Sequence, residues 1–228
     1  MKKSIGIIGG LGPLATVKFM EMLNERLSTV NEEIEMVVIN DPTTPDRTAY
    51  ILDNSKDNPN VTILNMVKKL NKNNVDIIVM PCNTASYFYK EIINATSIPF
   101  INIVEETTKY IANKNIKKVG LLATEGTIKS KIYEKMLKLE NIECIIPTDN
   151  DQKIITSIIY DGIKSGNDID LNSFYKVSNK LIDNGAEIII LGCTELSALK
   201  EIKSIKNPIF IDAMEILAEN TIKYLNIK

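Results

Sequence analysis

Short apolar runs alternate along the chain with longer segments in which apolar residues recur at helical spacing. The first run, 4–9, leads through a glycine turn into a segment that begins at Pro13, a residue suited to a first helical turn. Strands that alternate with helices form parallel sheets, so the pattern predicts an α/β protein with doubly wound parallel sheets. It predicts strands at 4–9, 35–40, 75–80, 99–102, 118–123, 143–147, 187–191 and 208–211, and helices over 13–28, 61–73, 84–95, 104–113, 130–140, 151–165, 172–183, from 194, and over 213–224.

The stretch 41–48, which reads Asp-Pro-Thr-Thr-Pro-Asp-Arg-Thr, is too polar and too rich in proline for regular structure. Because it leaves the carboxyl end of a strand, where doubly wound sheets bind ligands, we expect it near the functional site. It contains Arg47, one of only two arginines in the chain. A guanidinium suits a carboxylate through its planar fork, but a brace to Asp46 or Asp41 is an equally open interpretation.

A duplicated segment is the clearest feature of the pattern. Residues 75–86 and 186–197 both read as a buried strand, a Pro or Gly, a cysteine, and then small polar residues typical of a helix N-terminus. The offset between the copies is constant at 111 positions and brings Cys82 into register with Cys193. Each copy therefore predicts a strand, a tight turn that carries a thiol, and a helix.

A second duplicated pair extends the repeat to the whole chain, because 5–12 matches 119–126 with an offset of 114 positions. Two halves that pack about a pseudo-twofold axis would bring equivalent strand ends, and so the two thiols, to one interface. We expect one half to comprise 1–114 with 209–228, whose last helix crosses back, and the other to comprise 115–208.

Composition narrows the classes of function. A chain of 228 residues with 44% hydrophobic and 25% charged residues is typical of a soluble globular protein, and two halves of this size can each bury a core. The formal charge of −2 gives no basic surface for nucleic acid, and no segment has signal or membrane-spanning character. Three widely spaced cysteines indicate free thiols, so we expect a cytoplasmic protein without a membrane partner.

The chain contains no histidine. That absence excludes Ser-His-Asp and Cys-His catalysis within the chain and the usual histidine-containing zinc sites. Three dispersed cysteines do not supply the spaced pairs of an all-cysteine zinc site either, so we expect no metal. Proton transfer must fall to Cys, Asp, Glu, Lys or Tyr.

The two repeated cysteines suggest acid–base chemistry. A helix N-terminus stabilises a thiolate, so we expect the pKa values of Cys82 and Cys193 to be lowered and each thiol to act as a base. Thiols on opposite sides of one small ligand could take a proton from one face of a carbon and return one to the other, which inverts a stereocentre. The competing interpretation is a small buried hydrophobe, which we assign to Cys144.

The first turn also satisfies a dinucleotide fingerprint through Gly10, Gly12 and Ala15, with Asp41 as a ribose ligand. A nicotinamide-dependent oxidoreductase would use it. We favour the simpler interpretation that small residues let the strand turn tightly into the helix and leave room for a small anion.

Four motifs together make the chain resemble the cofactor-independent aspartate/glutamate racemase family, closest to its aspartate racemase branch, over nearly its whole length. The resemblance implies two pseudo-symmetric α/β domains with a site in the cleft between them, a two-cysteine base pair, no pyridoxal phosphate, and commonly a homodimer. It also implies that Arg47 and Lys164 hold the side-chain carboxylate of the substrate. The motifs are Gly9–Thr16 (GGLGPLAT), Pro45–Ala49 (PDRTA), Pro81–Ala85 (PCNTA) and Leu191–Leu196 (LGCTEL).

Two residues depart from the family pattern. Ser86 stands where many aspartate racemase relatives carry histidine, and Glu195 stands where the glutamate racemase branch has histidine. The second departure favours the aspartate or a broader-specificity branch. The candidate catalytic residues are Cys82 and Cys193, and the candidate substrate-binding residues are Gly10, Arg47, Asn83, Thr84, Thr124, Lys164, Thr194 and Glu195.

The expected function is thus a racemase that interconverts L- and D-aspartate, with glutamate as a further substrate. The alternatives are a maleate isomerase or hydantoin racemase of the same superfamily, the oxidoreductase named above, and a non-catalytic amino-acid sensor.

Overall fold

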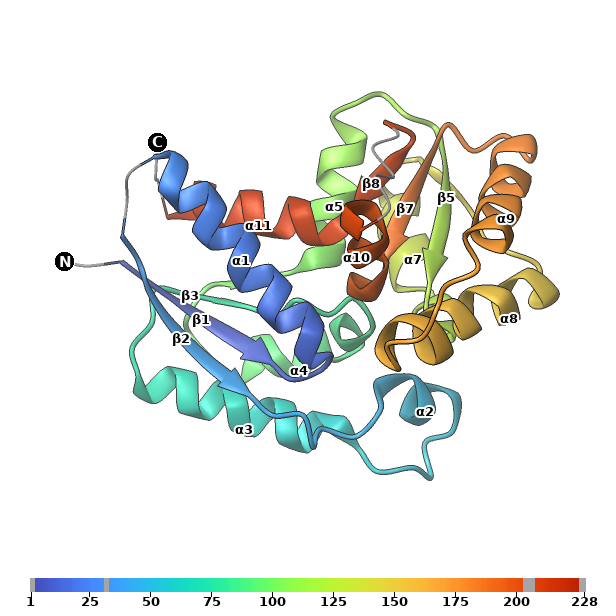
Figure 1. Cartoon of the computed structure of the whole chain (residues 1–228). Coiled ribbons are helices and arrows are strands. Elements are labelled where there is room, and N and C mark those ends of the chain that lie inside the picture. Colours follow the sequence, from blue (N-terminus) through green and yellow to red (C-terminus); the bar gives the residue numbers. More distant parts are fainter. Residues whose placement is uncertain (1–2, 31–32, 203–207, 226–228) are drawn as a thin grey trace.

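The structure is a computed structural model that describes residues 3–30, 33–202 and 208–225. It contains two four-stranded sheets, and every strand pair in them is parallel. The first has the order β2-β1-β3-β4 and the second the order β6-β5-β7-β8 (Figure 1). The strands are β1 Ser4–Gly9, β2 Glu35–Asn40, β3 Ile77–Val79, β4 Phe100–Ile101, β5 Lys118–Ala123, β6 Glu143–Ile145, β7 Ile188–Gly192 and β8 Phe210–Asp212.

The two sheets repeat one topology, since β1 to β4 correspond in order to β5 to β8. This confirms the expected α/β fold with two equivalent parallel sheets. Helices cover both faces of each sheet, as crossover connections between parallel strands require. The helices are α1 Pro13–Thr29, α2 Arg47–Leu52, α3 Pro59–Lys72, a 3₁₀ segment Thr84–Phe88, α4 Tyr89–Asn94, α5 Ile103–Ala112, α6 Glu125–Ser130, α7 Ile132–Leu139, α8 Asp149–Ser157, a π-helix Ile158–Lys164, α9 Leu171–Asp183, α10 Thr194–Ile202 and α11 Ala213–Tyr224.

The largest apolar cluster joins the two halves. It contains Ile5 and Ile7 from β1 together with Val119 and Leu121 from β5, all of them buried. Two further clusters fill the outer faces, one under α3 and α4 in the first half and one under α8 and α9 in the second. Alternate residues of a strand point to opposite faces, which explains why Ile8 belongs to the outer cluster.

The last helix of each half packs on the other half. α5 follows β4 of the first sheet and packs against α7, whereas α11 follows β8 of the second sheet and packs against α1 and α5. Figure 1 shows α11 lying beside α1. The packing is reciprocal: the last helix of each half packs on the other half, and the helices that receive them, α7 and α1, are equivalent in the duplication.

The proposed division of the chain needs one adjustment. It placed all of 209–228 in the first half, but β8 forms its hydrogen bonds with β7 of the second sheet. Only the helix of this segment, α11, packs on the first half as expected.

Several predicted elements have different bounds in the structure. Residues 41–48 are not irregular throughout, because the side chain of Asp46 accepts a hydrogen bond from the amide of Ala49 at 2.8 Å and starts α2 at Arg47. The helix expected over 84–95 opens with the 3₁₀ segment and becomes α-helical only at Tyr89. The helix expected over 151–165 is α8 followed by the π-helix.

The sequence predicts one helix over 130–140, but the structure has two helices in this region. Lys131 separates α6 from α7 by adopting a left-handed conformation with φ of 58°. A lysine in this conformation gives no signal in the sequence, unlike a glycine. None of the helices within the described residues combines the length and the hydropathy of a bilayer-spanning segment.

Candidate active site

The two repeated cysteines line one cavity between the halves. Cys82 follows β3 and is 8% exposed, and Cys193 follows β7 and is 4% exposed. The backbone amides of Ala85 and Glu195 act to lower the pKa values of Cys82 and Cys193, respectively, as expected where each thiol stands at the start of a helical segment. The duplication therefore brings its two thiols to one site.

Reciprocal contacts across the junction reveal the pseudo-twofold axis at this site. A Cβ atom on Gly12 would lie 2.7 Å from Oε1 of Glu195, and a Cβ atom on Gly126 would lie 3.1 Å from Cγ2 of Thr84. Gly12 and Gly126 are equivalent in the duplication, and so are Thr84 and Glu195. In each half, the turn after the first strand thus leaves room for the residue two positions after the cysteine of the other half.

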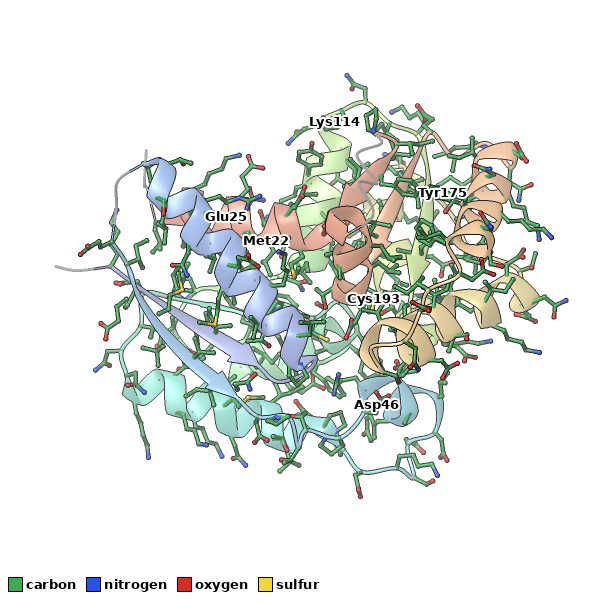
Figure 2. All side chains as sticks on the ribbon, viewed as in Figure 1. Met22, Glu25, Asp46, Lys114, Tyr175 and Cys193 are labelled. Carbon is green, nitrogen blue, oxygen red and sulfur yellow. The ribbon has the colours of Figure 1, made fainter. Side chains whose placement is uncertain are left out.

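The sequence-predicted residues gather here. Every one of them except Gly10 lines the thiol cavity, and Gly10 lines an open cleft directly beside it. In Figure 2, Cys193 and Asp46 mark the contributions of the two halves to this region. The lining of the thiol cavity is Leu11, Asp46, Arg47, Thr48, Cys82, Asn83, Thr84, Thr124, Tyr160, Lys164, Cys193, Thr194 and Glu195.

The thiol cavity is nearly closed. Its volume is about 10 Å³, enough for about one water molecule, whereas small-molecule sites ordinarily measure about 300 Å³ or more. The adjoining cleft has a volume of about 440 Å³. Because the same side chains border both spaces, they must move apart before an amino acid can pass from the cleft to the thiols. These shared residues are Leu11, Asp46, Arg47, Lys164 and Glu195.

Arg47 is buried and anchored by backbone carbonyls. Its Nη1 donates to Thr44 O at 3.3 Å and to Pro45 O at 3.1 Å, and its Nη2 donates to Leu11 O. The brace is therefore not the pair with Asp46 or Asp41 that the sequence left open. Within the described part of the chain, Nε has no hydrogen-bond partner although it is buried. An unpartnered buried donor is costly, so this N–H suits an acceptor on a ligand.

Asn83, which also lines the cavity, has a second unpartnered donor. Its Oδ1 accepts a hydrogen bond from the hydroxyl of Tyr133 at 2.6 Å, which fixes the amide, and its Nδ2 has no partner among the described residues. Two residues that line the cavity, Asn83 and Arg47, thus each have a buried N–H group without an acceptor among the described residues.

Three threonine hydroxyls join the halves behind the thiols. The Oγ1 atom of Thr84 lies 2.8 Å from that of Thr124 and 3.0 Å from that of Thr127, and the latter two lie 3.0 Å apart. Thr124 also caps α6 by accepting from the amide of Thr127. The triangle satisfies these hydroxyls with one another, so Thr84 and Thr124 serve chiefly to hold the junction together.

A chain of charged and polar groups crosses the mouth of the cavity. The hydroxyl of Tyr160 donates to Oδ2 of Asp46 at 3.3 Å, and Nζ of Lys164 lies 4.0 Å from the centre of the Tyr160 ring. Nζ of Lys164 is also 3.9 Å from Oε1 of Glu195. Burial favours the neutral amine, but the Glu195 carboxylate together with Tyr160, Cys193 and Asp46 outweighs it and raises the pKa of Lys164, which is therefore a cation.

The ionisation of the thiols differs from the expectation. Burial raises the pKa of Cys82 above its usual value, although Arg47 opposes the shift. Burial raises the pKa of Cys193 further, and the neighbouring Glu195 carboxylate adds to the effect. The helix ends were expected to lower both pKa values, but in a closed cavity the loss of hydration outweighs them.

Residues outside the cavity settle three further points of the sequence interpretation. Ser86 does not line the thiol cavity but a separate surface groove, so it takes no place beside the thiols. Cys144 lies in β6, where burial and the nearby Glu134 raise its pKa to about 12. Gly10 has a φ of 84°, and its turn is filled by the backbone of Asp41, which supports the tight-turn interpretation over a nucleotide site.

Tyr160 and Thr48 are the polar lining residues that the sequence interpretation missed. Tyr160 follows two isoleucines and reads as a core position, and its partner Asp46 stands in the other half of the chain. Within the described ranges, no group of three or more Cys, Asp or Glu side chains is arranged to hold a metal ion.

Comparisons with known proteins agree with this geometry. The family described as Asp/Glu/Hydantoin racemase matches residues 8–221. The broad specificity amino-acid racemase RacX of Bacillus subtilis is 35% identical over 227 residues, which cover 96% of each chain. Picrophilus torridus aspartate racemase superposes with a TM-score of 0.85 at 33% identity, over 99% of this chain and 95% of that one.

A glutamate racemase from Francisella tularensis, solved with D-glutamate, has the same fold, with a TM-score of 0.71 at 22% identity over 99% of this chain and 81% of that one. The resemblance inferred from the four motifs is confirmed. The chain belongs to the Asp/Glu/hydantoin racemase family, which supports an isomerase that acts on amino acids.

Proposed function

We propose that this protein interconverts L- and D-aspartate, with glutamate as a further substrate, by proton transfer between two cysteine thiols and the α-carbon. One observation supports the proposal: the cavity that both thiols line is also lined by Arg47 and Asn83, each of which has a buried N–H donor without an acceptor among the described residues. A dicarboxylic amino acid brings an acceptor for each of them.

The charges at the cavity suit such a substrate. Aspartate carries two carboxylates and one ammonium group, and the cavity offers two cations, Arg47 and Lys164, and two carboxylates, Asp46 and Glu195. We assign the side-chain carboxylate to Arg47 and Lys164, because both are cations and both line the cleft as well as the cavity. The α-carboxylate then falls to Asn83 and to the amides at the start of α10, and the ammonium group to Asp46 or Glu195.

Racemisation by this arrangement is a transfer of two protons. A thiolate on one side takes the α-proton, and the electron pair of the C–H bond stays on the α-carbon as a carbanion. The thiol on the other side then donates its proton to the opposite face, which forms a new C–H bond and leaves a thiolate there. Donors on the α-carboxylate stabilise the charge that the carbanion delocalises onto it.

The relatives support this proposal and define its main alternative. The Picrophilus torridus protein is an aspartate racemase, and the Bacillus subtilis protein is a broad specificity racemase. The test is a panel of L- and D-amino acids, a hydantoin and maleate, incubated without added cofactor and followed by chiral chromatography and α-deuterium exchange. We expect aspartate to be racemised fastest. Faster turnover of neutral amino acids would favour broad specificity, and turnover of only maleate or a hydantoin would refute the proposal.

Activity should not depend on a cofactor. After dialysis against a chelator and treatment with hydroxylamine, we expect racemisation at the untreated rate, since both proton carriers belong to the chain. A mock-dialysed sample is the control. Loss of activity that pyridoxal phosphate or a divalent metal restores would contradict the two-thiol proposal.

Two further proposals concern the setting of the reaction. Three unpaired cysteines suit a reducing compartment, and we propose the cytoplasm. We also propose a homodimer, as is common in the family, which light scattering on the purified protein tests.

A further inference from the structure

The duplication of the active site is not exact next to the thiols, and at one of the positions that differ the charge changes. Two residues after Cys82 stands Thr84, and two residues after Cys193 stands Glu195. A backbone amide acts to lower the pKa of each thiol, that of Ala85 for Cys82 and that of Glu195 for Cys193. The charge at the site differs between the two sides because one carries a hydroxyl where the other carries a carboxylate.

The two side chains have different partners. The hydroxyl of Thr84 bonds to Thr124 and Thr127, away from the thiol of its own half. The carboxylate of Glu195 turns to its own thiol, and the Sγ of Cys193 donates a hydrogen bond to Oε2 at 3.0 Å. A thiol can donate to a carboxylate only while it carries its proton. This contact thus requires the protonated form of Cys193.

The surrounding charges likewise favour the proton on Cys193 over the proton on Cys82. Arg47 is the stronger of the two cationic influences on the pKa of Cys82 and favours its thiolate, and it outweighs the opposing effect of Glu195. Around Cys193, the Glu195 carboxylate opposes the thiolate more strongly than Lys164 favours it. Tyr133 and Tyr160 also interact with this thiol, and both are neutral because burial raises their pKa values.

We infer that Glu195 is a positioning residue that holds Cys193 in its protonated form, so that Cys82 is the thiol that ionises first and acts as the base while Cys193 acts as the acid. This inference rests on the proposed two-thiol reaction. It assigns Glu195 a role toward the protein's own thiol, beyond the contact with the substrate ammonium group. After one turnover the two thiols have exchanged roles, and Cys193 must regain a proton before the same enantiomer can react again.

The test measures the reactivity of each thiol directly and does not require the enzyme to turn over a substrate. Iodoacetamide alkylation is followed from about pH 6 to about pH 10, and peptide mass spectrometry reports Cys82, Cys193 and Cys144 separately. Because the pH midpoint of an alkylation rate does not depend on how easily the reagent reaches the thiol, the two midpoints report ionisation. In the wild type we expect Cys82 to be alkylated about tenfold faster than Cys193 near neutral pH. The pH at which the alkylation rate is half-maximal should be higher for Cys193 than for Cys82.

The Glu195→Gln variant keeps the shape of the side chain and removes its charge. We expect its Cys193 midpoint to fall and the Cys193 rate near neutral pH to rise about tenfold, with little change at Cys82. Glu195→Asp, which keeps the charge, should restore much of the wild-type pattern. Asp161→Asn removes an exposed carboxylate from the nearby π-helix and serves as the matched control, with no change expected.

Three results would overturn the inference. They are equal midpoints at the two thiols in the wild type, an unchanged Cys193 midpoint in Glu195→Gln, and equal acceleration of both thiols in that variant, which would mean that Glu195 only keeps the cavity closed. The wild-type midpoints alone can refute it if the variant fails to fold. If the alkylation pattern holds but no substrate is racemised, the proposed function fails and the inequivalence of the thiols stands.

Discussion

Replacing either Cys82 or Cys193 by serine is expected to reduce racemisation by about a thousandfold or more, because a hydroxyl at neutral pH is a far weaker base and acid than a thiol. Both thiols line the cavity, so the loss of one leaves no group to complete the second proton transfer. The change is measured as the rate of loss of optical rotation with L-aspartate and with D-aspartate.

The partial reaction makes this experiment sharper. A variant with one thiol can still remove the α-proton from one face, so each variant should exchange the α-proton of one enantiomer with solvent deuterium without inverting it. The two variants should prefer opposite enantiomers. Exchange of the same enantiomer by both would place the two thiols on one side of the substrate and refute the two-base geometry.

Cys144→Ser is the matched control, since this cysteine lies in β6 and does not line the cavity. It should keep its activity, and all three variants should unfold within about 4 °C of the wild type. Near wild-type turnover by Cys82→Ser or Cys193→Ser would disprove the mechanism.

Arg47→Lys is expected to lower kcat/KM for aspartate relative to alanine, by an amount on the order of 2 to 4 kcal/mol in transition-state stabilisation. Lysine keeps the charge but loses the planar fork and its Nε–H, the donor that is left for a ligand. Arg47 also braces the carbonyls of Leu11, Thr44 and Pro45, so an absolute loss of activity would not identify its role.

The ratio of the two substrates removes this ambiguity. A loosened loop lowers activity on aspartate and alanine alike, whereas a lost carboxylate contact affects only aspartate. Arg26→Lys, at the other arginine, is the control, because Arg26 lies on α1 and donates to Met22 O. Equal losses on both substrates would assign Arg47 to the loop or to the α-carboxylate and would remove the main support for an acidic substrate.

Much of the fold could be predicted because it depends on local pattern and duplication. Buried parallel strands are continuous apolar runs, and the constant offset between the copies placed the two cysteines in equivalent turns. The elements that were mistaken depend on information a pattern does not carry. The left-handed Lys131 and the side-chain cap of Asp46 fix α6, α7 and α2 through single conformations or hydrogen bonds.

Most residues of the site could be predicted from the sequence, but their hydrogen-bond partners and the pKa values of the thiols could not. Motifs identified Arg47 and Glu195, yet only the structure shows the first bound to backbone carbonyls and the second bound to Cys193. The direction of the thiol pKa shifts was mistaken for the same reason, since the helix end is visible in a sequence and the closure of a cavity is not. Tyr160 was missed because its partner comes from the other half.

The reciprocal packing of α5 and α11 suggests how such a chain arose. A half-length ancestor with one cysteine would leave a face of its sheet layer bare, and two copies could cover both faces by exchanging their last helices, as in a domain-swapped dimer. Its two-fold axis would have given it two identical thiols and no way to distinguish them. Fusion of the two genes released each copy to change by itself, and a single residue, threonine in one copy and glutamate in the other, could then specialise the two sides of one site.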